Sequence, residues 1–482
     1  MKRIYILLLI NFFSCSKDEV NQDAIIYVQS ITINGVNITS GTVGQMTANV
    51  LPANAENKTI AWSVSDVSIA TISSSGLLTA LKNGNVLVTA TASDKNIVSA
   101  SKEITISSFE TGNDGSIEVS NSTQLLDALS KIKAGSSIIL TQGTYILNSK
   151  ITIGISGTAQ NKITLKGKEG QNRPKLDFSS MVENSANQGI VLSADYWHIK
   201  GIDIYKAGDN GLQIKGNHNL IEFCTFSECS DTGLQIDGGA SNNTILNCDS
   251  FFNADATMEN ADGFACKLTA GTGNKFIGCR AWQNLDDGWD GYLRGTDNIE
   301  TTYENCWAIK NGYLKNGTKG NGDGNGFKTG GSDDKLLKHH AIYKNCIAVG
   351  NVFDGFDHNS NRGKVTIYNC SAYDNGKNYS FSTTNPLEKL TIKNSNILGD
   401  FGSINATILE VTNNSWQNGI SSTSEDFESI DYNQLLNSRK ADGSLPDVTF
   451  FHLKAGSDLI DKGINVGLPF NGSAPDLGAF EY

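Results

Sequence analysis

This sequence is short of positive charge, of proline and of long apolar runs. Its 38 lysine and arginine residues are outnumbered by 50 aspartate and glutamate residues, which gives a net charge of -12. That balance argues against nucleic acid as a partner, since a nucleic-acid surface is itself negatively charged. A polyanionic substrate is still allowed, provided that a bound cation bridges it to the protein.

Proline numbers only 6 among 482 residues, whereas glycine reaches 49 and asparagine is frequent in the second half. Glycine and asparagine are the residues of tight turns. The composition therefore favours an all-β repeat protein over a helical enzyme, and the length allows two or three domains.

The only apolar run of note is at the amino terminus, where Lys2 and Arg3 precede Ile4 to Ile10. A charged start and a short apolar core indicate a secretory signal that is too short to span a membrane stably. Residues 1–15 resemble a bacterial lipoprotein signal, in which Cys15 becomes the lipidated first residue. The alternative is a plain cleaved signal.

Residues 16–24 are then a tether, and Ser16-Lys17-Asp18-Glu19 resembles the surface-export tag of Bacteroidetes lipoproteins. The resemblance implies an outer-membrane lipoprotein that faces the cell exterior, held to the membrane by its lipid anchor.

Residues 25–108 alternate apolar and polar side chains, with strands expected at 28–33, 59–64 and 86–92. The stretch from Trp62 to Gly84 resembles the bacterial immunoglobulin-like domain, group two. That resemblance implies a small β-sandwich with Trp62 in its core. A spacer role is expected, and adhesion to carbohydrate or a surface is the alternative.

Residues 109–116 read as a linker, and residues 122–132 have the apolar spacing of a helix capped by Ser122 or Thr123. A short amphipathic helix before many strands suits the end cap of a solenoid. The second domain is predicted to span residues 117–482, with its C-terminal ending packed as a closing cap.

The other cysteines recur with asparagine in a Cys-x-x-x-x-Asn frame at intervals of about two dozen residues or more. The frame occurs at Cys248, Cys279, Cys306, Cys346 and Cys370, and Cys224 to Cys229 keeps the same interval. Such a repeat indicates a parallel β-helix, with a ladder of cysteines inside and a ladder of asparagines at a turn. Buried thiols behave as small hydrophobes, so free cysteines are expected rather than disulfides or a zinc site.

A second frame places a large apolar residue after glycine on six rungs. Its members are Gly211-Leu212, Gly233-Leu234, Gly263-Phe264, Gly288-Trp289, Gly326-Phe327 and Gly355-Phe356. Equivalent positions on neighbouring rungs lie about 4.8 Å apart. The residues around this frame therefore stack on one surface, and Asp290 and Lys328 share one column.

Four carboxylates gather on this surface, and they would repel one another unless something neutralised them. They belong to Asp262, Asp286, Asp287 and Asp290. A hard divalent cation with all-oxygen ligands resolves the repulsion, and calcium fits best because it accepts many carboxylates in irregular geometry. The alternative is a set of solvated turn aspartates.

Lys328 is the candidate general base, because nearby positive charge from a bound cation would lower its pKa toward the working pH. The alternative is a solvated surface lysine, with Lys267 as the reserve base. Lys215, Lys267, Tyr292 and Arg294 are the expected substrate-binding residues.

The segments 260–264, 286–291 and 325–328 look like the motifs of polysaccharide lyase family nine. The resemblance implies a right-handed parallel β-helix, calcium held by the four aspartates and Lys328 as the Brønsted base. It implies a pectate lyase that acts on an acidic plant-type polysaccharide, the pectin backbone. We expect the protein to be a monomer. The alternatives are a rhamnogalacturonan backbone lyase, a β-helix glycosidase with two carboxylates, or a non-catalytic glycan-binding adhesin.

Overall fold

The computed structural model of the chain describes residues 25–39, 43–107 and 116–482. The predicted signal, Cys15, the tether and all of the linker except Ser116 lie outside these residues. The chain divides into two compact units, Met1–Phe109 and Glu110–Tyr482. Within the described residues, no helix has the length and apolar character that crossing a membrane requires.

The first unit consists of short antiparallel sheets, ordered β1-β3, β2-β6-β5 and β4-β7-β8. Its strands are β1 (Ser30–Asn34), β2 (Val43–Gln45), β3 (Thr47–Leu51), β4 (Ile60–Val64), β5 (Ala70–Ile72), β6 (Leu77–Ala80), β7 (Gly84–Ala92) and β8 (Ser99–Ile106). Their inward residues, such as Leu78 and Val88, form one apolar core. Trp62 is only partly buried and packs against this core, so it lies at the margin and not at the centre.

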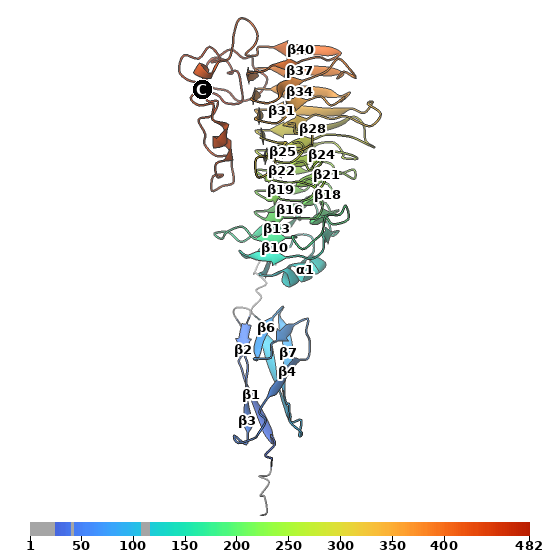
Figure 1. Cartoon of the computed structure of the whole chain (residues 1–482), viewed down its shortest axis with the longest axis vertical. Helices are drawn as coiled ribbons and strands as arrows, with labels where there is room; N and C mark the ends of the chain where they lie inside the picture. Colours follow the sequence, from blue (N-terminus) through green and yellow to red (C-terminus); the bar gives the residue numbers. More distant parts are fainter. Residues whose placement is uncertain (1–24, 40–42, 108–115) are drawn as a thin grey trace, which may run out of the picture. The chain divides into compact units, whose positions relative to one another are not determined.

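The second unit is a coil of three parallel sheets, each built by pairing one strand per rung (Figure 1). The first sheet has twelve strands: β9 (Ser116–Val119), β10 (Ser137–Leu140), β13 (Ile163–Gly167), β16 (Trp197–Lys200), β19 (Leu220–Glu222), β22 (Thr244–Leu246), β25 (Asn274–Ile277), β28 (Ile299–Glu304), β31 (His339–Lys344), β34 (Lys364–Tyr368), β37 (Lys389–Lys393) and β40 (Ile408–Thr412).

The second sheet has ten strands: β11 (Thr144–Ile146), β14 (Lys175–Asp177), β17 (Asp203–Tyr205), β20 (Thr225–Ser227), β23 (Asp249–Phe251), β26 (Arg280–Trp282), β29 (Trp307–Ile309), β32 (Ile347–Val349), β35 (Ser371–Tyr373) and β38 (Asn396–Leu398). The third sheet also has ten: β12 (Ile151–Ile153), β15 (Ile190–Leu192), β18 (Leu212–Ile214), β21 (Leu234–Ile236), β24 (Phe264–Cys266), β27 (Trp289–Asp290), β30 (Phe327–Lys328), β33 (Asp354–Asp357), β36 (Lys377–Ser380) and β39 (Gly402–Ser403).

Large aromatic rings of the third sheet stack inside the coil from rung to rung. The Trp289 ring lies 5.1 Å from Phe264 and 4.8 Å from Phe327, between ring centroids, and Phe327 lies 5.1 Å from Phe356. Because side chains alternate along a strand, the residue after each stacked ring faces outward. The inner stack therefore fixes which side chains reach the outer surface.

Both predicted ladders are present in the coil. The eight cysteines of the described residues are free and buried, which confirms that they form no disulfides. The asparagine amides bond in series: Asn253 Nδ2 donates to Asn284 Oδ1 over 2.8 Å, Asn284 to Asn311 over 3.0 Å, and Asn311 to Asn351 over 2.9 Å.

The single α-helix of the described residues, α1 (Ser122–Lys131), covers the first rung. It buries Leu125 and Ala128 in the same core as the first strands of the coil, as expected for an end cap. Its N-cap is Asn121, whose Oδ1 accepts a hydrogen bond from the backbone nitrogen of Gln124 over 3.0 Å. The predicted caps, Ser122 and Thr123, are already inside the helix.

The C-terminal segment contains two 3₁₀ turns, η1 (Ser424–Asp426) and η2 (Tyr432–Leu436), and lies beside the coil (Figure 1). Its apolar side chains, including Phe450, share a buried cluster with Trp307 and Val349 on the outer face of the second sheet. In the last strand, β40, Ile408 and Leu409 stay 50% and 49% exposed. The predicted closing cap is therefore a lateral cover, because the apolar residues that it buries lie on the side of the coil.

Candidate active site

The glycines of the repeated frame allow the rungs to approach closely at the third sheet. A Cβ atom added at Gly288 would lie 2.6 Å from the carbonyl oxygen of Gly326, and one at Gly326 would lie 2.6 Å from that of Gly355. The residues on either side of these glycines are therefore brought together on the outer face. Asp290 pairs in register with Lys328, as the shared column predicts.

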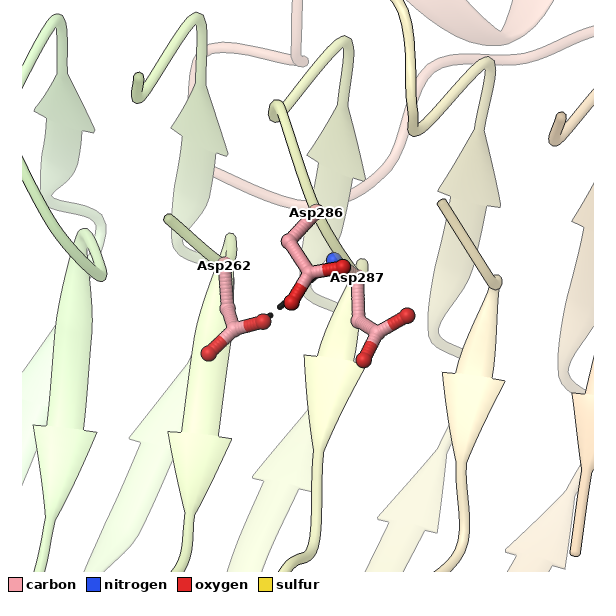
Figure 2. Close-up of side chains that lie close together, drawn as sticks. All are labelled: Asp262, Asp286 and Asp287. Atoms are coloured by element: carbon pink, nitrogen blue, oxygen red, sulfur yellow. Dashed lines mark hydrogen bonds between the residues drawn. The ribbon is translucent and has the colours of Figure 1, made fainter. Parts of the chain in front are cut away.

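Three aspartates converge at this face, two from one turn and one from the preceding rung (Figure 2). Asp262, Asp286 and Asp287 are buried, and they offer ligand oxygens that all lie within 4.8 Å of one another. The backbone nitrogen of Asp287 donates to Asp262 Oδ1 over 3.3 Å, which holds the two rungs together.

Burial and mutual repulsion make this cluster unstable as free carboxylates. Burial, together with the charge of Asp262, raises the pKa of Asp286 to about 7. Burial and the neighbouring charge of Asp286 raise the pKa of Asp287 well above its ordinary value. The cluster therefore calls for a positive partner in addition to the lysines beside it.

The donor set fits a hard divalent cation such as calcium, since every side-chain ligand atom is a carboxylate oxygen. Asp287 Oδ2 is buried and accepts no hydrogen bond, although Lys328 Nζ lies 3.1 Å away. Asp290 is adjacent but outside the group of three: its Oδ1 accepts from the backbone nitrogen of Tyr292 over 2.9 Å. Its role as a fourth ligand stays a prediction.

Lys328 lies at the edge of the carboxylate cluster, with its side chain 11% exposed. Its Nζ is 3.1 Å from Asp287 Oδ2, 3.5 Å from Asp323 Oδ2 and 4.0 Å from Asp290 Oδ1. Burial alone would lower the pKa of Lys328, but the charges of Asp287 and Asp290, with those of Asp286 and Asp262, raise that pKa well above the ordinary value. We expected a bound cation to lower the pKa of Lys328. Without a cation, the carboxylates have the opposite effect on this pKa.

Lys267 is paired with two carboxylates of the site, and its place as reserve base stays a prediction. Its Nζ lies 2.7 Å from Asp262 Oδ2 and 3.4 Å from Asp290 Oδ2, and its side chain is 15% exposed. Burial opposes its charge, but Asp262 and Asp290 together raise its pKa above the ordinary value. Lys267 is therefore a counter-ion to two of the carboxylates.

Of the other predicted substrate-binding residues, two lie at the groove and one does not. Tyr292 and Arg294 line a groove of about 710 Å³ that also reaches Lys328 and Lys267. The Tyr292 hydroxyl donates to Asp333 Oδ1 over 2.7 Å, and Arg294 pairs with the same carboxylate. Lys215 is exposed and is not among the residues that line this groove.

Asp323 belongs to the site although it lies in a long insertion that interrupts the repeat between Cys306 and Lys328. Besides its contact with Lys328, its backbone nitrogen donates to Asp286 Oδ1 over 2.6 Å. The insertion therefore folds back onto the carboxylate cluster. The residue lies outside both repeated frames, so periodicity gave no signal for it.

Comparisons with known proteins agree with this architecture. The family described as "Pel9A-like, right handed beta helix region" matches residues 107–396, and the bacterial Ig-like domain (group 2) matches residues 28–104. Pectate lyase L of Dickeya dadantii (strain 3937) is 37% identical over 372 residues, which cover 73% of this chain and 84% of that protein.

Two solved structures resemble the coil closely enough to be informative. The crystal structure of pectate lyase Pel9A aligns with a TM-score of 0.68 and 35% identity, over 74% of this chain and 90% of that one. A rhamnogalacturonan lyase aligns with a TM-score of 0.62 and 27% identity, over 69% of this chain and 92% of that one.

Proposed function

This chain belongs to the Pel9A-like right-handed β-helix family, and from that membership we propose that it is a pectate lyase that cleaves 4-linked galacturonate by calcium-assisted β-elimination. The observation that carries the proposal is the register of the third sheet. It aligns Lys328 with Asp290 beside a cluster of three buried carboxylates, at the edge of a groove.

The chain's own residues supply the parts that this reaction needs. Asp262, Asp286 and Asp287 would hold calcium, with Asp290 as the proposed fourth ligand. When bound, calcium neutralises the substrate carboxylate and stabilises the negative charge that develops beside it. Lys267, already paired with Asp262 and Asp290, keeps those two carboxylates oriented.

Lys328 Nζ takes the proton from C5 of the galacturonate, next to the substrate carboxylate. The electron pair of the C5–H bond forms the C4–C5 double bond, and the C4–O bond breaks. The leaving sugar keeps the glycosidic oxygen and takes up a proton, so the new non-reducing end is 4,5-unsaturated. Lys328 acts only in its neutral form, so the reaction is favoured at alkaline pH.

The likeness to a rhamnogalacturonan lyase supports a second candidate, the alternating rhamnogalacturonan backbone, on which the same elimination is possible at each uronate. A non-catalytic glycan binder would share the groove and the cation site but would release no unsaturated product.

Ultraviolet absorbance of unsaturated product separates these functions. Purified residues 25–482 would be given polygalacturonate and rhamnogalacturonan separately, at mildly alkaline pH, with calcium and with chelator. We expect a calcium-dependent rise in absorbance on at least one substrate. No rise on either polymer, with the protein folded and calcium bound, would indicate a binder.

We also propose that the enzyme is a surface lipoprotein anchored through Cys15, because the first residues read as a lipoprotein signal. Fatty-acid labelling of the expressed full chain, compared with Cys15→Ala, tests this: equal labelling of both proteins contradicts it.

A further inference from the structure

A buried imidazole lies inside the coil, behind the turn that follows Asp290. It belongs to His339, the first residue of β31, whose register partner on the preceding rung is Ile299. The apolar Ile299 is part of the core, whereas a fully buried imidazole costs free energy unless its ring nitrogens are hydrogen-bonded. The sequence therefore places a polar ring where packing alone favours an apolar side chain.

Both ring nitrogens of His339 are engaged. Nδ1 lies 2.7 Å from the carbonyl oxygen of Gly291, which can only accept, so this nitrogen carries the proton and donates. Nε2 lies 2.8 Å from Thr301 Oγ1 and accepts from that hydroxyl. Burial lowers the pKa of His339 to about 4, so the ring is neutral at neutral and alkaline pH.

The peptide unit that His339 binds is also the one that holds the carboxylate of Asp290. Its carbonyl oxygen, on Gly291, accepts from His339. Its N–H, on Tyr292, donates to Asp290 Oδ1 over 2.9 Å. Because a peptide unit is planar, fixing its carbonyl also fixes the direction of its N–H. The imidazole inside the coil therefore sets the direction of the hydrogen bond that Asp290 accepts outside it.

Asp290 in turn lies between the two lysines of the site. Its Oδ2 is 3.4 Å from Lys267 Nζ, and its Oδ1 is 4.0 Å from Lys328 Nζ. Gly291 makes a second connection to Lys328, because its nitrogen donates to the Lys328 carbonyl oxygen over 3.0 Å. A shift of the Gly291 carbonyl would therefore move Asp290 relative to both lysines.

The backbone of His339 is itself fixed by Asn361, on the next rung. The His339 nitrogen donates to Asn361 Oδ1 over 3.1 Å, and Asn361 Nδ2 donates back to the His339 carbonyl oxygen over 2.8 Å. The same amide donates to the carbonyl oxygen of Thr329, which follows Lys328, over 3.0 Å. The imidazole is thus anchored beside Lys328 and reaches back one rung to Gly291.

Building on the proposed function, in which Asp290 is the fourth calcium ligand, we propose that His339 is a positioning residue of the active site. Through the Gly291 carbonyl it orients the carboxylate of Asp290. It thereby sets the calcium affinity of the cluster and the place of Lys328 beside it. His339 acts only through this peptide and exchanges no proton in the reaction.

Two substitutions separate the two hydrogen bonds of the ring. In His339→Asn, the amide nitrogen occupies the place of Nδ1 and still donates to Gly291. In His339→Gln, the longer amide reaches the place of Nε2 near Thr301, and the Gly291 carbonyl loses its donor. A role in packing alone predicts the opposite order, because Asn leaves the larger cavity.

Calcium affinity is measured by calorimetry on each protein without substrate. We expect His339→Gln to bind calcium at least about tenfold more weakly than the wild type, and His339→Asn to stay within about threefold. Hydrogen–deuterium exchange in chelator gives a readout without metal: the Tyr292 amide should exchange faster in His339→Gln than in the other two proteins. On polygalacturonate at saturating calcium, kcat should fall about tenfold in His339→Gln, with a smaller change in KM.

His358→Asn is the matched control. His358 is also buried, and its Nε2 lies 2.8 Å from the carbonyl oxygen of Asn385, which the shorter amide does not reach. This variant should lower the melting temperature but keep the calcium affinity of the wild type. If His339→Gln does not fold, His339→Met replaces it, because Met fills the inner position with an apolar side chain and offers no donor to Gly291.

Equal calcium affinity in the wild type and in the variant without the donor would overturn the inference. A loss in His339→Asn as large as that in His339→Gln would also overturn it, and so would a wild type that binds no calcium. If calcium binds with the expected order of affinities but no polymer yields unsaturated product, the lyase is refuted and the positioning role stands.

Discussion

Lys267 and Lys328 both face the groove, yet their partners give them different roles. Lys267 lies within 3.4 Å of oxygens from Asp262 and Asp290, whereas Lys328 reaches Asp287 and Asp323. Asp323 is 66% exposed, so one partner of Lys328 is open to solvent. This difference supports the proposed roles, in which Lys267 is a fixed charge and Lys328 transfers the proton.

Replacing Lys267 by methionine should destabilise the cation-free protein by about 3–5 kcal/mol, because Asp262 and Asp290 would keep buried charges without their partner. Calcium should then raise the melting temperature of Lys267→Met by more than that of the wild type. Thermal unfolding in chelator and in calcium measures both effects. The control is Lys215→Met, which replaces an exposed lysine two rungs earlier in the same column and should behave as wild type. If calcium raised the melting temperature of all three proteins equally, the counter-ion role would be contradicted.

His339 provides a pH-dependent contribution to stability. It is fully buried, its Nδ1 lies 2.7 Å from the Gly291 carbonyl oxygen and its Nε2 2.8 Å from Thr301 Oγ1. Burial lowers its pKa from 6.5 to about 4. Protonation therefore favours the unfolded chain, so the stability is fully present above pH 6.5 and is lost as the pH falls toward 4.

The loss amounts to roughly 3 kcal/mol over that range. Denaturant unfolding at several pH values should show that His339→Gln loses less stability than the wild type between pH 6.5 and 4, by about one proton of linkage. Parallel pH profiles for the two proteins would mean that His339 does not titrate on unfolding.

Among single residues, the sequence indicated the carboxylates and Lys328 because they occupy columns of a repeated frame. It could not indicate that Lys267 turns toward Asp262, since that depends on the rotamer chosen inside a crowded groove. Asp323 could not be predicted as a site residue for another reason. It lies in the insertion between Cys306 and Lys328, which has no register with the repeat.

At the scale of elements, the asparagine ladder ties successive rungs together. Asn311 is fully buried; it accepts from Asn284 over 3.0 Å and donates to Asn351 over 2.9 Å. Asn375 ends the same ladder and is only partly buried. The cost of removing an amide should therefore depend on its position in the ladder.

We expect Asn311→Ala to lower the free energy of unfolding by about 2–4 kcal/mol, because buried groups on both neighbouring rungs lose a partner. Asn375→Ala should cost less, since water can replace its amide. Urea unfolding of both variants measures the difference, and equal costs would show that the ladder does not act as a buried series.

The strands of the third sheet were the most predictable elements. A large apolar residue after glycine occupies the stack at Phe264, Trp289 and Phe327, and the pairing register follows directly from that frame. The N-terminal end of α1 was harder to predict, because Asn121, Ser122 and Thr123 all have side chains that cap helices well. The backbone conformation in the folded chain makes Asn121 the cap.

At the scale of the whole molecule, an arginine pair joins the C-terminal segment to the coil. Arg439 Nη2 lies 2.7 Å from Asp249 Oδ1 and also donates to the Cys248 and Gly278 carbonyl oxygens. Arg280 binds the same buried carboxylate over 2.8 Å. The lateral position of this segment was not predictable, since Arg439 and Asp249 are 190 residues apart and share no motif.

Arg439→Ala should loosen the C-terminal segment before the coil unfolds, because Asp249 would lose one of its two cations and two carbonyl oxygens would lose a donor. Limited proteolysis should then cleave after residue 437 faster than in the wild type. Lys440→Ala, an exposed neighbour paired only at the surface with Asp447, is the matched control. Equal cleavage rates in all three proteins would refute the anchoring role.

The most direct test of the account compares Lys328→Ala with Lys267→Ala in the absorbance assay for unsaturated product, at saturating calcium, with calcium binding measured on each protein. We predict that Lys328→Ala binds calcium and stays folded but loses at least about a thousandfold in kcat, as expected when a general base is removed. Lys267→Ala should retain more activity. Substantial product from Lys328→Ala, with none from a folded, calcium-bound Lys267→Ala, would contradict the assignment and move the base to Lys267.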